Sequence, residues 1–277
     1  MATSDYEGKK FDSGSVSRII DALTVEEALQ ININKEPFTV TMRTPGDDLG
    51  LVRGLLHSEG VLKNTSYSPD VILRKENQNG IVTIVDLSIP ETELGSGYSN
   101  SRSLLSVSSC GICGRKELDE LAFMGKMIPD TQKMDVDVIQ TMFEKMNHRQ
   151  NAFNQTGGSH AAAAFDSEGN LLSSKEDIGR HNAVDKVIGD LILADELQNV
   201  STITVSGRIS YEIIIKAFKA RIPILCAVSA PSTLAVDYAK ELGITLLAFC
   251  REGRATCYSN PQRIITSQQE NKTNYSA

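Results

Sequence analysis

Two cysteines in a short glycine-rich segment are the residues best suited to do chemistry in this chain. Cys110 and Cys113 are spaced CxxC within the segment Ser108–Gly114. Such a pair can carry a persulfide, cycle as a redox dithiol or supply half of a zinc site. Arg115 and Lys116 follow directly, and positive charge beside a cysteine is typical of a thiol with a lowered pKa. The local sequence therefore favours a reactive thiolate.

Zinc binding and thioredoxin-like chemistry are the alternatives for this pair. A zinc site needs two further ligands, and the remaining cysteines, Cys226, Cys250 and Cys257, form no second CxxC. Cys226 and Cys250 also lie in apolar runs, where a small buried hydrophobe is the usual role. A thioredoxin motif is expected after an early strand of a compact βαβ unit, whereas this pair follows a long Ser-rich stretch. A structural or incidental pair stays open.

The segment Thr156–His160 is the second candidate for a binding role. Gly157 and Gly158 together predict a nest whose backbone N–H groups approach an anion. His160 could donate a hydrogen bond to a phosphate or act as a structural histidine. A plain turn before a strand is the alternative interpretation.

The segment Glu176–Asn182 concentrates ionisable residues at a predicted strand-to-helix junction. Here Arg180 could bind phosphate at a helix N-terminus, while His181 handles protons. A solvated helix cap is the alternative.

Two later strand ends carry further arginines. Arg208 lies in Ser206-Gly207-Arg208, and Arg251 and Arg254 lie in Phe249–Arg254. Arginine pairs with phosphate bidentately, and its plane or a Phe ring can stack on a base. Each signal is weak alone, but together they predict a pocket for a large phosphorylated ligand.

These residues are positioned by two regions of different pattern. The first hundred residues are typical of a small α+β unit, and from Gly158 onward strands alternate with helices, which predicts a sheet with helices on its faces. Ligands of such sheets usually lie at the carboxyl ends of strands. The ends, up to about Ser15 and after about Gln268, are polar and predicted to be mobile, and 91–109 is predicted to be a linker or mobile loop. The predicted early elements are strands at 38–42, 71–73 and 81–87 and a helix after 47, with Leu49, Val52, Leu55 and Leu56 on one face. The later ones are helices near 135–146, 182–194, 210–220 and from 232, and strands at 161–165, 171–174, 202–206, 222–227 and 244–249.

Composition bounds the function classes. The 277 residues carry a net charge of −7, which argues against general nucleic-acid binding. No apolar run approaches ~18 residues, so a membrane span is not expected. Met1–Ser15 lacks the apolar core of a secretory signal. Five cysteines with one close pair fit a cytoplasmic protein with reactive or metal-bound thiols.

Taken together, the motifs resemble the FdhD/NarQ family of formate dehydrogenase accessory sulfur carriers. The resemblance extends from about residue 15 to about 265. It rests on the ordered series Cys110–Gly114, Thr156–His160, Asp177–Lys186, Ser206–Arg208, Ser229–Ser232 and Phe249–Arg254. The block DIGRHNAVDK makes it far more specific than CxxC alone.

The resemblance implies a sulfurtransferase-type carrier that is required for formate dehydrogenase activity. It implies a persulfide accepted from a cysteine desulfurase on Cys110, with Cys113 as a second thiol whose role stays open. The sulfur would pass to the molybdenum bis(molybdopterin guanine dinucleotide) cofactor before insertion into formate dehydrogenase. A homodimer is also implied. A non-catalytic cofactor chaperone with a structural CxxC is the rival.

The resemblance also implies the cofactor site and the fold. The family's cofactor-binding stretch matches Phe249, Cys250, Arg251, Glu252, Gly253 and Arg254; Gly157, Gly158, His160, Arg180, His181 and Arg208 complete the expected site. The implied fold is α/β, with a small α+β domain over 15–125 and a cytidine-deaminase-like sandwich over 126–268. No zinc is expected, because a deaminase needs H-x-E followed by P-C-x-x-C. In this chain His160 precedes Ala161-Ala162.

Overall fold

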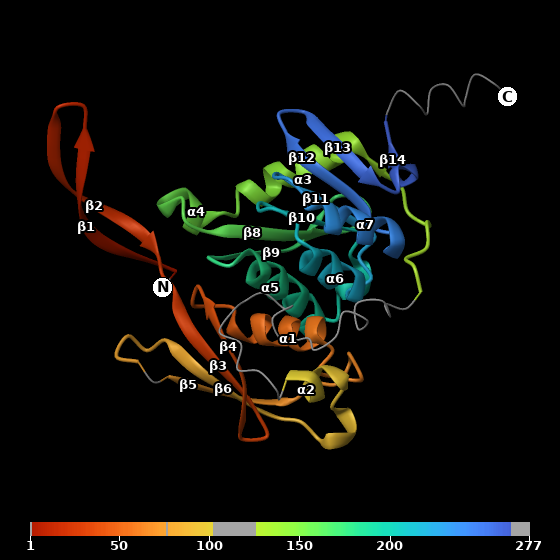
Figure 1. The fold of residues 1–277 in the computed structure, drawn as a ribbon, viewed down its shortest axis with the longest axis horizontal. Helices are drawn as coiled ribbons and strands as arrows, with labels where there is room; N and C mark the ends of the chain where they lie inside the picture. Colours follow the sequence, from red (N-terminus) through yellow and green to blue (C-terminus); the bar gives the residue numbers. More distant parts are fainter. Residues whose placement is uncertain (1, 76, 102–125, 267–277) are drawn as a thin grey trace.

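The computed structural model describes residues 2–75, 77–101 and 126–266. Two sheets lie on either side of packed helices, and a hairpin projects from the body (Figure 1). From one side of the molecule to the other, the layers are α3, a six-stranded sheet, α5 with α6 and α7, α1 and a four-stranded sheet. No helix among the described residues is long and apolar enough to cross a membrane.

The projecting hairpin corrects the prediction that residues up to Ser15 are a mobile end. β1 (Thr3–Asp12) and β2 (Ser15–Thr24) pair antiparallel along their whole length. The base of the hairpin is fixed to the body, where the hydroxyls of Thr24 and Thr156 lie 2.7 Å apart. Both faces of the ribbon are largely exposed, so its sequence lacks the apolar–polar alternation that marks a half-buried strand.

The four-stranded sheet has the order β4-β3-β6-β5, in which only the β3–β6 pair is parallel. It confirms the early predicted strands. The predicted strands are β4 (Glu36–Arg43), β5 (Asp70–Lys75) and β6 (Val82–Ser88). The sequence did not predict the fourth strand, β3 (Glu27–Ile33). The helix α1 (Asp48–Glu59) covers one face through Leu51, Val52 and Leu56. Leu49, predicted on that face, is 45% exposed.

Residues 91–101 were predicted to belong to a linker, but they are ordered against this first core. The 3₁₀ turn Glu91–Glu93 precedes α2 (Ser96–Ser101). Tyr98 is buried and stacks on Phe38 with ring centroids 6.3 Å apart. Gly95 and Gly97 let this segment approach α1, since added Cβ atoms would meet the carbonyls of Gly60 and Glu59.

The six-stranded sheet confirms the predicted alternation of strands and helices after Gly158. Its order is β13-β12-β11-β10-β8-β9; β10, β11 and β12 are parallel, and the other pairs are antiparallel. The strands are β8 (His160–Phe165), β9 (Leu171–Asp177), β10 (Thr202–Val205), β11 (Ile224–Ala227), β12 (Thr245–Arg251) and β13 (Arg254–Ser259). The sequence did not predict β13, nor the short elements α4 (Asn151–Thr156), β7 (Met134–Asp135) and β14 (Ile264–Ile265).

Each face of this sheet has its own apolar core. In β8, Ala162 and Ala164 face α5 (Arg180–Leu193), α6 (Tyr211–Lys219) and α7 (Thr233–Leu242). The intervening Ala161 and Ala163 face α3 (Val136–Asn147). The structure is thus a mixed α/β fold. The narrower likeness to cytidine deaminases and the division into domains at residues 125 and 126 stay predictions.

The crossing of α1 and α5 joins the two sheets. At Gly54 an added Cβ would lie 1.9 Å from the carbonyl oxygen of Asp185, and at Gly189 it would lie 1.8 Å from that of Gly50. Only glycine permits such backbone contact. Polar contacts stabilise the crossing. Ser58 donates to Asp185 at 2.7 Å, and Lys216 pairs with the same carboxylate.

Candidate functional site

The site predicted from the sequence falls into two parts. Cys110 and Cys113 lie outside the residues that the structure describes. The predicted cofactor-binding residues all lie within them. The described part of the site lies at the carboxyl edge of the six-stranded sheet.

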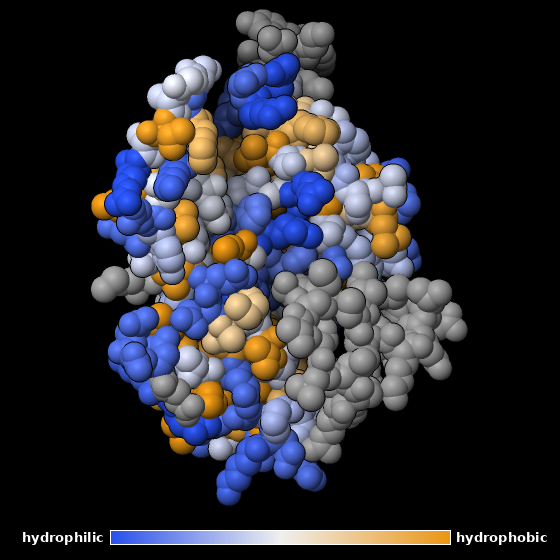
Figure 2. Space-filling view, turned by 60° about the vertical axis from the view of Figure 1, so that its left-hand side comes forward, coloured by the Kyte–Doolittle hydropathy of each residue, from blue (hydrophilic) through white to orange (hydrophobic). Residues whose placement is uncertain are grey.

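Register brings the predicted segments to one edge. Val205 of β10 is level with Ala227 of β11, and β12 continues that register in parallel. Beyond it, the amide of Val228 donates to the carbonyl of Val205, and that of Phe249 donates to Ser229. Because β8 is antiparallel to β10, its first residue reaches the same edge. Figure 2 turns this side of the molecule toward the reader and shows strongly hydrophilic residues near the centre of the face.

The N-terminus of α5 is held at this edge by a buried carboxylate. Asp177, the last residue of β9, accepts from the amides of Gly179 at 2.8 Å and Thr44 at 3.1 Å. It also pairs with Lys186 at 2.9 Å, and both side chains are almost fully buried. No side chain caps the helix, so the first-turn amides and the helix dipole face the edge. This arrangement suits an anion.

A cationic cluster surrounds Gly207 beside that helix end. An added Cβ at Gly207 would lie 3.3 Å from His160 Nδ1 and 3.4 Å from Cβ and Cδ of Arg180. The Nε of Arg180 is buried without a hydrogen-bond partner among the described residues. Burial and the charges of Arg180 and Arg208 lower the pKa of His160. His160 and Arg180, from separate predicted segments, therefore form one cluster, with Arg208 close enough to act on His160.

His181 faces a second polar group on α6. Its Nε2 lies 3.0 Å from Ser210 Oγ and 3.9 Å from the carboxylate of Glu212. Burial and Arg180 lower the pKa of His181 to about 4, while Glu212 acts in the opposite direction. The imidazole is therefore neutral near pH 7 and can accept or donate one proton. This setting suits a hydrogen-bonding role more than that of a fixed cation.

Hydrogen bonds already occupy the predicted glycine nest. The amide of Gly157 donates to the carbonyl of Phe153 at 2.7 Å, and that of Gly158 donates to Thr156 Oγ1 at 3.0 Å. Gly157 has φ +66 and ends α4. The two glycines thus lie at the correct edge, but their amides offer an anion no free donor in this conformation.

The predicted stretch 249–254 forms the turn between β12 and β13. Phe249 has φ +55 beside a register irregularity, an unusual conformation for a bulky residue. Its ring lies 6.5 Å from that of Tyr258 and is 38% exposed. Arg251 and Arg254 are exposed and opposite each other, and Arg254 pairs with Glu252. Gly253 completes the turn with φ +70. The turn thereby places an aromatic ring and two exposed arginines at the edge.

Cys250 differs from its neighbours because its side chain points into the core. It is 1% exposed and packs in the cluster that contains Cys226 and Cys257. Burial raises the pKa of the Cys226 thiol, and the hydrogen bond with Cys226 lowers that of Cys250. Among the described residues, no group of three His, Cys, Asp or Glu side chains could hold a metal ion.

Ser210 and Glu212 belong to this site although the sequence did not single them out as site residues. Ser210 precedes α6, where a Ser is most simply interpreted as a helix cap, yet it makes no capping hydrogen bond and contacts His181 instead. Asp177, also missed, acts by orienting the α5 terminus. The signal available was an acidic residue in each strand-to-helix connection, two positions before Gly179 and two positions after Ser210.

Comparisons with known proteins show which family the chain resembles. The family model described as FdhD/NarQ family matches residues 24–265. A "Sulfur carrier protein FdhD" of Streptomyces avermitilis is 39% identical over 264 residues, covering 91% of this chain and 92% of the relative. One of Saccharolobus solfataricus is 41% identical over 248 residues, covering 88% and 91%.

A solved structure shares the fold. A protein from Desulfotalea psychrophila, assigned as a formate dehydrogenase accessory protein, aligns with a TM-score of 0.75 and 21% identity. The alignment covers 96% of this chain and 100% of that protein. On the family model and the sequence identity together, this chain belongs to the FdhD/NarQ family.

Proposed function

We propose that this protein is a sulfur carrier that serves a formate dehydrogenase. It accepts sulfur from a cysteine desulfurase as a persulfide on Cys110. It transfers that sulfur to the molybdenum bis(molybdopterin guanine dinucleotide) cofactor, which is its substrate, before the cofactor enters formate dehydrogenase. Family membership supports the sulfur chemistry. The cationic cluster around Gly207 is the observation that supports binding of the cofactor.

The first step needs only a thiolate on this chain. The Cys110 thiolate attacks the outer sulfur of the desulfurase persulfide, a new S–S bond forms, and the desulfurase thiolate leaves. The charge and atom count balance without an added oxidant. Arg115 and Lys116 follow the pair in sequence and favour the thiolate form.

The carboxyl edge fits the phosphates of a guanine dinucleotide. Arg180 and Arg208 supply charge-assisted donors, and the amides at the start of α5 supply neutral ones. The buried, unpartnered Nε of Arg180 is a donor that a bound phosphate would satisfy. Phe249 and the exposed Arg251 and Arg254 could cover a base. A protein of net charge −7 needs such a focused site to bind an anionic cofactor.

Mass spectrometry tests the sulfur step. After incubation with a cysteine desulfurase and cysteine, the wild-type protein should gain sulfur on Cys110. Cys110→Ala should gain none there, whereas Cys257→Ala should load normally, because Cys257 packs against the apolar core on the α3 face of the six-stranded sheet. Unchanged sulfur loading of Cys110→Ala would contradict the assignment of Cys110 as the persulfide carrier.

Titration with guanosine diphosphate, which represents half of the dinucleotide, tests the cofactor site. Arg180→Met and Arg208→Met should each weaken binding about tenfold to hundredfold, the effect of losing one charge-assisted contact of about 1.5–3 kcal/mol. Arg18→Met, on the exposed hairpin, is the matched control. Equal affinity of all three variants for guanosine diphosphate would contradict cofactor binding at the carboxyl edge.

A non-catalytic cofactor chaperone is the second candidate, because the cationic cluster around Gly207 is formed by residues other than the CxxC pair. It predicts that Cys110→Ala still yields an active formate dehydrogenase, whereas the carrier predicts an inactive one. We also propose a cytoplasmic homodimer, whose two subunits would bind the two guanine nucleotides. Size-exclusion chromatography with and without guanosine diphosphate tests whether the protein is a dimer.

A further inference from the structure

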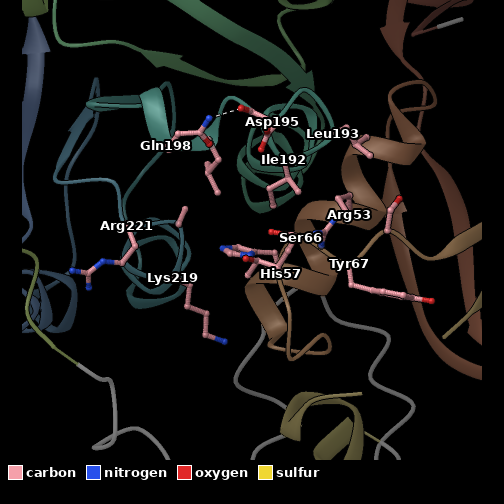
Figure 3. A pocket seen from close by; sticks show the side chains of 14 residues that line it. Arg53, His57, Ser66, Tyr67, Ile192, Leu193, Asp195, Gln198, Lys219 and Arg221 are labelled. Atoms are coloured by element: carbon pink, nitrogen blue, oxygen red, sulfur yellow. Dashed lines mark hydrogen bonds between the residues drawn. The ribbon is translucent and has the colours of Figure 1, made fainter. Parts of the chain in front are cut away.

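A cavity of about 790 Å³ lies away from the carboxyl edge. Figure 3 shows it between α1, the loop 65–68 and the C-terminal ends of α5 and α6. Arg180 begins α5 and Leu193 ends it, so the length of that helix, about 20 Å, separates this cavity from the candidate cofactor site.

The cavity contains a buried cation with unused hydrogen-bonding capacity. Arg53 is 5% exposed, and its Nη2 donates to the carbonyl of Thr65. Its Nη1 is buried and has no hydrogen-bond partner among the described residues. Burial lowers the pKa of Arg53, yet a guanidinium stays charged at neutral pH. No ion pair balances that charge within the described part of the chain.

A second cation and an imidazole lie beside Arg53. His57, one helical turn further along α1, is 9% exposed, and burial with the charge of Arg53 lowers its pKa to about 4. The charges of Lys219 and Lys216 of α6 also lower the pKa of His57, whereas a hydrogen bond with the Lys219 backbone raises it. Lys219 Nζ donates to the carbonyl of Ser58 at 2.5 Å. The only carboxylate on the cavity wall among the described residues is the exposed Asp195.

The rest of the wall divides into a polar and an apolar part. Hydroxyls come from the loop 65–68 (Figure 3). Ile192, Leu193 and Leu197 supply an apolar surface opposite. A guanidinium, hydroxyls and an apolar wall match an anionic head with an apolar body.

We propose that this cavity is a second binding site, which takes a small organic anion with its phosphoryl or carboxylate head on Arg53. Neutralising the helix C-termini is the other role open to these cations. Lys219 fulfils it through the Ser58 carbonyl, but it leaves Nη1 of Arg53 unexplained. This proposal goes beyond sulfur transfer and does not depend on it.

The test titrates the full-length protein with phenyl phosphate, inorganic phosphate and phenylacetate at constant ionic strength. NMR follows the imidazole signals of the four histidines, with His57 assigned from a His57→Gln spectrum. The wild-type His57 signal should shift to saturation and its pKa should rise, because an anion favours the protonated ring. Phenyl phosphate should bind more tightly than phosphate, and the comparison with phenylacetate distinguishes a phosphoryl from a carboxylate head.

Variants decide whether Arg53 holds the anion. Arg53→Gln should weaken binding at least about tenfold, and Arg53→Lys should weaken it less. Should Arg53→Gln fail to fold, Ser66→Trp, at an exposed wall position, blocks the cavity without touching the core. Lys240→Met, exposed at the end of α7, is the control and should bind normally. Absence of saturation at His57, or equal binding by Ser66→Trp and the wild type, overturns the proposal.

Discussion

At the scale of single residues, the surroundings of His181 fix its charge. Its pKa of about 4 in the folded protein lies below the ordinary 6.5. Between these values the unfolded chain binds a proton that the folded one does not, so stability falls as the pH drops through this window. The difference of about 2.5 units corresponds to about 2–3 kcal/mol by pH 4.

His181→Gln should therefore flatten the decline of the unfolding free energy between pH 6.5 and 4. Urea denaturation at several pH values in phosphate-free buffer measures it. His148→Gln, at the exposed end of α3, should leave the slope unchanged. If the unfolding free energy of His181→Gln fell with pH as steeply as that of the wild type, burial of the His181 ring would not cause the decline.

Phe249 combines backbone strain with an exposed ring, and the two can be separated. Asn tolerates positive φ better than Phe, so Phe249→Asn should change the unfolding free energy by no more than about 1 kcal/mol. The variant should nevertheless bind guanosine diphosphate about tenfold more weakly, which is the effect of losing one stacking contact. Phe11→Asn on the hairpin, where Phe11 is 74% exposed, should affect neither measurement. Unaltered nucleotide affinity in Phe249→Asn would exclude stacking.

At the scale of elements, the crossing of α1 and α5 depends on glycine. Gly54→Ala would place a methyl group 1.9 Å from the Asp185 carbonyl, so the helices must separate. We expect a loss of at least about 2 kcal/mol in urea denaturation. Gly8→Ala, whose Cβ would meet only the Ile19 side chain at 3.5 Å or more, should lose far less. Equal losses would mean that the helices part freely.

The elements themselves could largely be predicted, because apolar periodicity marks one-sided burial. It located α3, α5, α6 and α7 and the strands between them. It failed for the hairpin β1–β2, whose two faces are both exposed, and for β13, whose polar sequence pairs along the sheet edge. Leu49 shows a finer error, because the position of α5 across the crossing decided which face of α1 is buried.

At the scale of the whole molecule, a buried ion pair links both sheets. Asp185 of α5 contacts Lys216 of α6 at 2.7 Å and Ser58 of α1 at 2.7 Å. Asp185→Asn should cost about 3–5 kcal/mol, since it leaves a buried ammonium group without its counter-charge. The double variant Asp185→Asn/Lys216→Met should recover much of that loss. Additive losses in urea denaturation would show that the pair is not coupled.

The sequence by itself determined the family, the segments that carry the chemistry and the alternation of strands and helices, since these follow from residue types and local spacing. Only the tertiary structure decided that His160 and Arg180 share one cluster beside Gly207, because they meet through strand register. It alone also brought Arg53 and His57 of α1 to the ends of α5 and α6. Arg53 and His57 lie more than a hundred residues from those helix ends in the chain. No local pattern encodes a contact that depends on how two helices cross.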